Sequence, residues 1–242
     1  STVTITADEI ELAGSIGSGS MTTVTADIVT LSGSISSDVI NLNLGANAPL
    51  SGGRGEIYGT MSSSSAVQVA GGAARDLLAV HQGASIPGGL TYDGGSGTDT
   101  LWLDTSAAHG WAILGNDAGS VTDTALGTVQ FSNVENLTGG SGGDEFDFLS
   151  DTATISGVLD GQGGADWLDY SARISSVNVD LLTGLASATG GTTRIENVAG
   201  GDGADVIWGD DGDNFLQGGG GDDTLAGRSG RDALDGGSGH DS

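Results

Sequence analysis

The chain of 242 residues has no cysteine and no lysine, and it contains only two prolines. Without cysteine there is no disulfide, and with three histidines a zinc or copper site of the usual composition is not expected. Six arginines stand against 32 acidic residues, a formal net charge of −26, which argues against nucleic acid as a partner. No apolar run approaches about eighteen residues, so no transmembrane helix is predicted.

Glycine and aspartate are what the chain has in excess. Its 46 glycines interrupt every stretch in which an amphipathic helix could form, so we expect no helix. Most of the acidic residues are aspartates, the residue type that favours turns and metal sites. The first residue is Ser1 and no signal peptide follows it, so we expect a processed chain or a fragment.

Residues 200–242 form five consecutive nine-residue units, the last of them incomplete. Each unit opens with glycine, and each complete unit carries a bulky apolar residue at its eighth place or next to it. Asp, or Asn once, returns at the sixth place, as Asp205, Asn214, Asp223, Asp232 and Asp241. A disordered Gly/Asp-rich tail is the alternative, but composition alone does not supply apolar positions in phase.

Nine residues hold one turn and a strand of about three residues, so two units make one coil of a flattened solenoid. Units eighteen residues apart then lie one above the other, which places Asp205 over Asp223 and Asn214 over Asp232. Coils about 4.8 Å apart would bring unneutralised carboxylates into repulsion. Carboxylates together with backbone carbonyls suit Ca²⁺ better than Mg²⁺ or a transition metal.

These units resemble the RTX, or haemolysin-type, calcium-binding repeat GGxGxDxUx, where U is a large apolar residue. The resemblance implies a parallel β-roll in which each ion lies between one turn and the turn two units later. It implies carbonyl ligands from the second and fourth places of the earlier turn and from the first and third places of the later turn. Both sixth-place side chains complete the set.

On this chain the resemblance implies three ions, with Asn214 expected to weaken the second site. The implied sets are Gly201, Gly203, Asp205, Gly218, Gly220 and Asp223; then Asp210, Gly212, Asn214, Gly227, Ser229 and Asp232; then Gly219, Gly221, Asp223, Gly236, Ser238 and Asp241.

The N-terminal stretch repeats with a different sequence. Residues 4–16 recur nineteen residues later at 23–35, and polar and apolar residues alternate within each copy, as in a strand with one buried face. Short strands at a coil-sized period favour a parallel β-helix, while an antiparallel sandwich stays open because only two copies match well. Further strands are predicted at Val39–Leu44, Glu56–Met61, Ala66–Ala70 and Leu77–His81.

Between these stretches lie two related blocks, at 89–144 and 157–201, each running from a GGxGxD-like turn to a strand that feeds another such turn. Asp99, Asp144 and Asp166 are candidate metal ligands in these turns, although no in-phase neighbour completes an oxygen shell.

The predicted fold class is therefore all-β, a right-handed parallel β-helix or solenoid that runs into a calcium-binding parallel β-roll. We divide the sequence into a β-helix-like solenoid at 1–88, degenerate RTX blocks with strand-rich insertions at 89–199, and the regular calcium-binding array at 200–242, incomplete at its C-terminus.

No catalytic motif stands out, and the many acids lie in equivalent turns that do not separate an acid from a base, so we expect no enzyme. No nucleophile motif accompanies His81 or His109, and His240 fills a variable place of a repeat. We expect all three histidines at the surface.

The leading hypothesis is an extracellular structural or adhesive protein that binds calcium after secretion and then folds and stiffens. The subunit of a surface or biofilm-matrix filament is one such protein. The unfinished last repeat favours end-to-end self-association or continuation into further repeats. The RTX resemblance implies type I secretion from a Gram-negative bacterium. The alternative is a non-catalytic RTX module of a secreted enzyme whose catalytic domain lies elsewhere. A pore-forming toxin fragment would need an apolar helical region that the sequence lacks.

Overall fold

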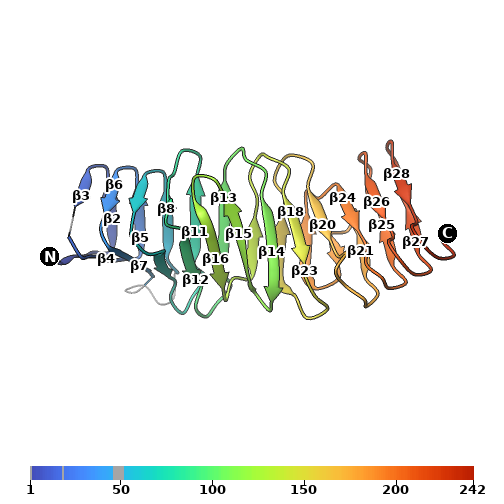
Figure 1. Ribbon diagram of the computed structural model, residues 1–242, viewed down its shortest axis with the longest axis horizontal. Helices are drawn as coiled ribbons and strands as arrows, with labels where there is room; N and C mark the ends of the chain where they lie inside the picture. The colour runs from blue at the N-terminus through green and yellow to red at the C-terminus, as the bar shows by residue number, and fades with distance from the viewer. Residues whose placement is uncertain (1, 18, 46–51) are drawn as a thin grey trace. The chain divides into compact units, whose positions relative to one another are not determined.

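The computed structural model describes residues 2–17, 19–45 and 52–242 (Figure 1). Within these ranges the regular secondary structure consists of β-strands, with no α-helix, so the all-β prediction is confirmed. The chain divides into two compact units. The first unit holds Ser1–Ser106 and Ser120–Thr138, and the second holds Ala107–Gly119 and Gly139–Ser242. The division of the sequence into three segments stays a prediction.

The first unit is built from parallel sheets whose neighbouring strands come from successive coils (Figure 1). Since each coil returns the chain to the same sheets, the arrangement is that of a parallel solenoid. One sheet runs in the order β1 (Thr2–Thr6), β4 (Met21–Ala26), β7 (Val39–Leu44), β10 (Val67–Ala70), β12 (Leu90–Asp93) and β16 (Gly127–Ser132). A second runs β2 (Glu9–Leu12), β5 (Ile28–Leu31), β8 (Arg54–Ile57), β11 (Leu77–His81), β13 (Thr100–Asp104) and β17 (Asn136–Thr138). A third holds β3 (Ser15–Gly17), β6 (Ser34–Ser36) and β9 (Thr60–Ser62).

The nineteen-residue repeat sets the register of the first coils. Strand β1 pairs with β4 in parallel, β2 with β5 and β3 with β6, and each pairing joins equivalent places of the two copies. The parallel pairing rules out the antiparallel sandwich for this stretch. The predicted strand Glu56–Met61 divides into β8 and β9, because the chain turns at Gly59, where an added Cβ would lie 2.0 Å from the carbonyl oxygen of Gly33.

Apolar side chains stack from coil to coil inside the first unit. The register places Leu42 beside Val69, Val69 beside Tyr92 and Tyr92 beside Phe131 on neighbouring strands, and all four are buried. Each fully buried side chain of this size stabilises the fold by about 1.5–3 kcal/mol relative to exposure. The alternation of the sequence supplies this column, because every second residue of a strand points to the same face.

The second unit also stacks parallel strands, shown from green to red in Figure 1. One sheet runs β14 (Gly110–Gly115), β18 (Glu145–Phe148), β20 (Trp167–Asp169), β24 (Asn197–Ala199), β26 (Phe215–Gln217) and β28 (Ala233–Asp235). Another runs β22 (Leu185–Ala186), β21 (Asn178–Asp180), β25 (Val206–Trp208) and β27 (Thr224–Ala226), where β22 alone is antiparallel to its neighbour. Strand β19 (Ile155–Asp160) pairs with β23 (Thr189–Thr193), and β15 (Ala118–Asp123) holds residues of both units.

The nine-residue units of 200–242 form the end of this unit as a two-sided roll. Strands of three residues alternate between two sheets, so that β26 pairs with β28 and β25 with β27, each eighteen residues apart. Val198, Leu216 and Ile207 fill the space between the sheets with no exposed surface. The Gly-rich turns connect the two sheets at either edge, which is where the predicted metal ligands lie.

Candidate metal centre

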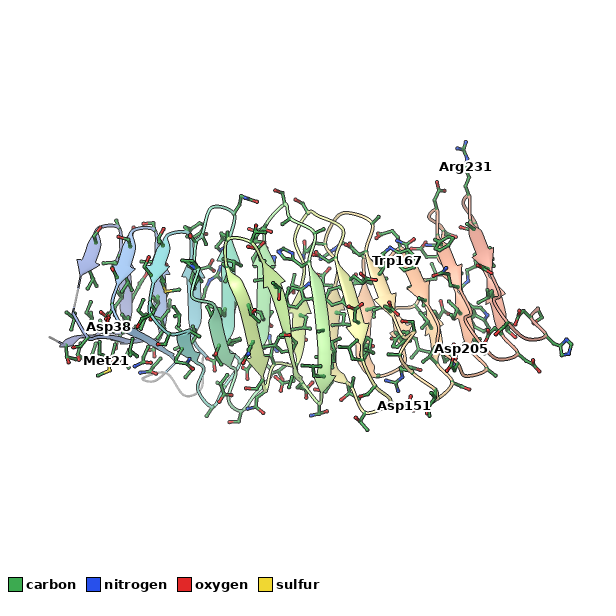
Figure 2. All side chains as sticks on the ribbon, in the orientation of Figure 1. Met21, Asp38, Asp151, Trp167, Asp205 and Arg231 are labelled. Carbon is green, nitrogen blue, oxygen red and sulfur yellow. The ribbon has the colours of Figure 1, made fainter. Side chains whose placement is uncertain are left out.

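The turns of the array stack into two columns. We call the turns at 200–205, 218–223 and 236–241 the first turn column, and the turns at 209–214 and 227–232 the second turn column. In the first turn column the amide of Asp205 donates to Oδ1 of Asp223 at 2.7 Å, and the amide of Asp223 donates to Oδ1 of Asp241 at 3.0 Å. In Figure 2, Asp205 lies at one edge of the roll, and Arg231 of the second turn column extends from the opposite edge.

The aspartates of the first turn column are buried. Asp205 and Asp223 are each 1% exposed. Oδ1 of Asp205 accepts from the amide of Val177 at 2.8 Å, and Oδ2 accepts from the amide of Gly201 at 2.9 Å. Burial raises the pKa of Asp205, and these two hydrogen bonds act in the lowering direction. Oδ2 of Asp223 is buried and has no hydrogen-bond partner among the described residues.

Glycine is required in these turns because the coils approach one another closely. Gly221 has a φ of +115°, and a Cβ there would lie 2.4 Å from the carbonyl oxygen of Gly203 in the coil below. An L-residue rarely adopts this φ, so the sequence pattern and the turn geometry agree. The close approach brings carbonyl oxygens of successive turns to the same edge as the buried carboxylates.

The first turn column fits a calcium ion. Its donor set is made of carboxylate and carbonyl oxygens, the ligands that Ca²⁺ prefers, and the orphaned Oδ2 of Asp223 needs a positive partner. The carbonyls of Gly201 and Gly219 each accept one backbone hydrogen bond, from Gly220 and Ser238, which leaves each a second lone pair. The ligands implied here are Gly201, Gly203, Asp205, Gly218, Gly220 and Asp223 for one ion, and Gly219, Gly221, Asp223, Gly236, Ser238 and Asp241 for the next. Their role as ligands stays a prediction.

The second turn column contains the same stacking contact with different chemistry. The amide of Asn214 donates to Oδ1 of Asp232 at 3.0 Å. The side chain of Asn214 accepts from the amide of Asp210 and donates to Oδ1 of Asp210 and to the carbonyl of Glu196. These contacts bring together Asp210, Asn214 and Asp232. That Asp210, Gly212, Asn214, Gly227, Ser229 and Asp232 together ligate an ion stays a prediction.

Arg228 stands at the second place of its repeat, where the pattern has glycine. Its guanidinium donates to both carboxylate oxygens of Asp180 on β21, at 2.5 and 2.9 Å, and to the carbonyl oxygen of Gly209. It also lies over the Trp208 ring, 5.6 Å from the ring centroid. Pairing with Arg228 lowers the pKa of Asp180.

A second arginine lies at the beginning of the first turn column. The side chain of Arg173 is almost fully buried and donates to the carbonyl oxygens of Ser150, Asp151 and Ala153 at 3.1–3.3 Å. The carbonyl of Arg173 in turn accepts from the amide of Asp202 in the first turn of the array at 200–242. This guanidinium satisfies a group of turn carbonyls at the same edge of the roll as Asp205, where Figure 2 also places Asp151.

The three outlying candidates, Asp99, Asp144 and Asp166, are fully buried and have in-phase neighbours that spacing did not reveal. In the second unit, the amide of Asp144 donates to Oδ1 of Asp166, and the amide of Asp166 donates to Oε2 of Glu196. In the first unit, the amide of Asp99 donates to Oε2 of Glu135. Burial raises the pKa of Asp99 to about 6 and that of Asp166 to about 7. The Oδ2 atoms of both lack hydrogen-bond partners among the described residues.

Asp76 belongs to the same series and was not predicted. It is fully buried, its amide donates to Oδ1 of Asp99 at 2.7 Å, and its Oδ2 accepts from the amide of Gly72 at 2.5 Å. The signal was present in the sequence, because Asp76 is the sixth residue of a unit that opens Gly71–Gly72 and carries Leu78 at its eighth place. Ala74 at the fourth place, where glycine is the rule, concealed it.

Glu135 and Glu196 were missed for a related reason. Each stands at the sixth place of a unit, at 130–138 and 191–199, with Leu137 and Val198 at the eighth places. These units lack the paired glycines, so the sixth-place acid could not be distinguished from an ordinary strand residue. The structure shows that the glutamates accept the same amide hydrogen bond as the aspartates of regular turns.

One acidic cluster lies outside the predicted sites. Glu145, Asp147 and Asp169 stand on neighbouring strands β18 and β20, and one oxygen from each lies within 4.8 Å of the others. Their alternation with buried Phe146 and Leu168 places them on the outer face of the sheet. Burial, Glu145 and Asp169 raise the pKa of Asp147 to about 7.

The expectation that all three histidines are at the surface is wrong for two of them. His109 is 2% exposed, and its Nδ1 lies 3.0 Å from Oδ1 of Asp144. His81 is 8% exposed, its Nδ1 lies 2.8 Å from Oδ2 of Asp104, and its Nε2 contacts Glu56. Each is held by carboxylates from neighbouring coils, which sequence spacing does not show. His240 is exposed, as expected.

Comparison with known families identifies the array. Residues 190–225 and 208–242 match the model of the RTX calcium-binding nonapeptide repeat, described as four copies. The segment 190–242 thus carries RTX calcium-binding repeats, and the recognition made from the sequence is confirmed. Searches of curated proteins and of solved structures found no match. In the part of the chain that the structure describes, no helix has the length and hydropathy needed to cross a membrane.

Proposed function

We propose that this chain is a calcium-dependent structural element of a secreted protein, whose RTX turns fold and stiffen when calcium binds outside the cell. The main support is the buried Oδ2 of Asp223, which has no hydrogen-bond partner among the described residues and lies in a repeat of a calcium-binding family. An ionised carboxylate buried in this way costs free energy unless a cation neutralises it.

The calcium response follows from the stacked acids. At low calcium, as inside a cell, the buried carboxylates of successive coils disfavour the compact state. Extracellular calcium modules bind in the range of about 10⁻⁴–10⁻³ M, so external calcium would stabilise the folded state by mass action. The chain would therefore remain threadable during export and become stiff afterwards. RTX repeats typify secreted bacterial proteins, which supports this order of events.

We further propose a structural or adhesive role at a cell surface or in a matrix, without catalysis by this chain. Asp99 and Asp166 lie in equivalent turns, and burial raises the pKa of both in the same direction. A general acid and base instead need environments that separate their pKa values. The competing proposal, a non-catalytic module of a secreted enzyme from a Gram-negative bacterium, would place catalysis outside these residues.

Self-association is part of the proposal. Strand β28 pairs with β26 on one side, and Leu234 at its centre is 46% exposed. A further coil, from a continuation of the chain or from a second copy, would pair at the other edge of β28. Sedimentation velocity with calcium tests the second copy, and a monomer at every concentration would contradict it.

Far-ultraviolet circular dichroism tests the calcium-dependent folding. We expect β-structure in calcium, partial loss of it with excess chelator, and recovery when calcium is restored in excess. Magnesium at the same ionic strength controls for charge screening. An unchanged spectrum and an unchanged melting temperature after complete removal of calcium would contradict the proposal.

A further inference from the structure

We infer that calcium binds along the first turn column only, and that the second turn column is held by a cation which the chain itself supplies, the guanidinium of Arg228. The inference rests on the proposed function, because it takes calcium binding by the array as its premise. It removes from the implied three-ion arrangement the ion between turns 209–214 and 227–232. It also assigns to Arg228 the neutralisation of the acidic side chains of these two turns.

The first step concerns Asn214, whose polar side-chain atoms all have hydrogen-bond partners. Its oxygen accepts from the amide of Asp210 at 2.9 Å. Its NH₂ group donates to the carbonyl of Glu196 at 2.9 Å and to Oδ1 of Asp210 at 3.2 Å. Asn214 is 3% exposed, so these contacts fill its surroundings. An NH₂ group presents hydrogens and not lone pairs, so this side chain offers a cation only the second lone pair of one neutral oxygen, where aspartate would offer a charged carboxylate.

The second step concerns the positive charge beside the same turns. The carbonyl of Gly209 accepts from the guanidinium of Arg228, which is anchored in a bidentate pair with Asp180. A planar guanidinium held by two charge-assisted hydrogen bonds is a fixed positive charge. The hydrogen bond to Asp180 raises the pKa of Arg228, and the charges of Asp211 and Asp210 act in the same direction. The positive charge that an ion would bring is thus already present beside the second turn column.

The two columns differ at equivalent places. Asp223 in the first turn column has a buried, unpartnered Oδ2, whereas Asn214 has a partner for each polar atom of its side chain. The second place of the later turn is Gly219 in the first column and Arg228 in the second. Asn for Asp removes one negative charge and Arg for Gly adds one positive charge, a combined change equal to the charge of one Ca²⁺.

The contact of Arg228 with Asp180 also ties the array to the strands before it. Asp180 ends β21, which pairs with β25 of the first repeat, and Arg228 belongs to the fourth repeat. Protein contacts therefore connect the two turns of the second turn column without an ion. Calcium then binds only at the opposite edge of the roll, where Asp205, Asp223 and Asp241 stack.

A matched pair of substitutions in the full chain tests this assignment. Asp223→Asn and Asp232→Asn make the same change at equivalent places in the two columns. In each variant the remaining side-chain oxygen can still accept the stacking hydrogen bond from Asp205 or Asn214. Bound calcium is counted by equilibrium dialysis and by isothermal titration, and circular dichroism in saturating calcium checks the fold. We expect Asp223→Asn to lose at least one calcium ion relative to the unmodified chain, and Asp232→Asn to lose none.

A gain-of-site variant provides the converse test. The double substitution Asn214→Asp with Arg228→Gly restores the repeat pattern in the second turn column, and we expect it to bind one calcium ion more than the unmodified chain. It should also melt at a lower temperature than the unmodified chain in chelator, since it replaces the internal cation with an unneutralised carboxylate. Failure to gain an ion would overturn the inference.

The outcomes separate the inference from the proposed function. If Asp232→Asn loses as many ions as Asp223→Asn, or if Asp223→Asn loses none, the column assignment is wrong while the array still binds calcium. If the unmodified chain binds no calcium, the proposed function itself fails. A smaller number of ions in Asp223→Asn alone, with an additional ion in the double variant, supports the inference.

Discussion

The backbone amide of Asp205 donates a 2.7 Å hydrogen bond to the carboxylate of Asp223, eighteen residues later in the chain. This contact links the repeat of the sequence to the chemistry of the site. It holds two buried aspartates in successive coils, and it uses one oxygen of Asp223 while leaving the other without a hydrogen-bond partner. The same amide-to-carboxylate contact joins Asp76 to Asp99 and Asp144 to Asp166. A single local arrangement thus recurs through turns with very different sequences.

Asp205→Asn should destabilise the fold even where calcium is absent. Both oxygens of Asp205 accept backbone amides, from Val177 and Gly201, so the NH₂ group of asparagine would face an N–H donor in either orientation. We expect a loss of about 1–3 kcal/mol in the free energy of unfolding in chelator. Asp8→Asn, at an exposed position, is the control and should change it by less than about 0.5 kcal/mol. Equal effects of the two substitutions in urea unfolding would contradict this prediction.

The calcium-free protein should lose stability as the pH rises through neutrality. The pKa of Asp147 is raised to about 7 in the folded state from 3.8, so its protonated form favours folding. This contribution is fully present below about pH 4 and is lost as the pH rises through about 7. Asp99 and Asp166 act in the same direction.

Asp147→Asn should therefore flatten this pH dependence. Asparagine stays neutral, so the variant should be more stable than the unmodified chain above pH 7, by about 1 kcal/mol once solvent screening is allowed for. Thermal melting from pH 4 to 8 in chelator measures the difference, and Asp8→Asn, at an exposed position, is the control. Parallel pH profiles for Asp147→Asn and the unmodified chain would contradict the assignment.

Gly221→Ala should be among the most disruptive glycine substitutions in the array. The residue has a φ of +115°, and the new Cβ would lie 2.4 Å from the carbonyl oxygen of Gly203. We expect a loss of about 1–3 kcal/mol and weaker calcium binding, because the turn must shift to relieve the contact. Gly163→Ala is the matched control, since a Cβ there meets nothing within 4 Å. If both variants melt at the same temperature, the close approach of the coils is not as described.

Arg173→Ala should weaken the beginning of the first turn column. The substitution leaves the carbonyls of Ser150, Asp151 and Ala153 without their guanidinium donor. We expect a loss of about 2–4 kcal/mol, because one buried and two part-buried acceptors would lose charge-assisted hydrogen bonds. Arg231→Ala, at an exposed turn where the side chain points away from the ribbon (Figure 2), should change stability little. Urea unfolding at fixed calcium compares the two, and a loss in Arg231→Ala as large as in Arg173→Ala would refute the role of the buried guanidinium.

Much of the fold was predictable because, in a solenoid, residues at the same place of successive sequence repeats lie next to each other in neighbouring coils. The nineteen-residue repeat predicted which residues pair in the first coils, and the nine-residue repeat predicted pairing eighteen residues apart. The neighbours of Asp99, Asp144 and Asp166 were not predictable in this way. The sequence separations of their pairs are 36 for Asp99 with Glu135, 22 for Asp144 with Asp166 and 30 for Asp166 with Glu196. Insertions change the length of each coil, so the period that reveals a neighbour is lost.

The sequence by itself determined the strand pattern, the Gly-rich turns and the oxygen-rich character of the array, since each depends on residues within one or two repeats. Only the tertiary structure decided which acids are buried, that His109 meets Asp144, and that Arg228 reaches Asp180, 48 residues away. These contacts depend on how coils of unequal length stack. Stacked coils bring together the side chains that occupy the same position in the cross-section of the solenoid, whatever their separation in the sequence.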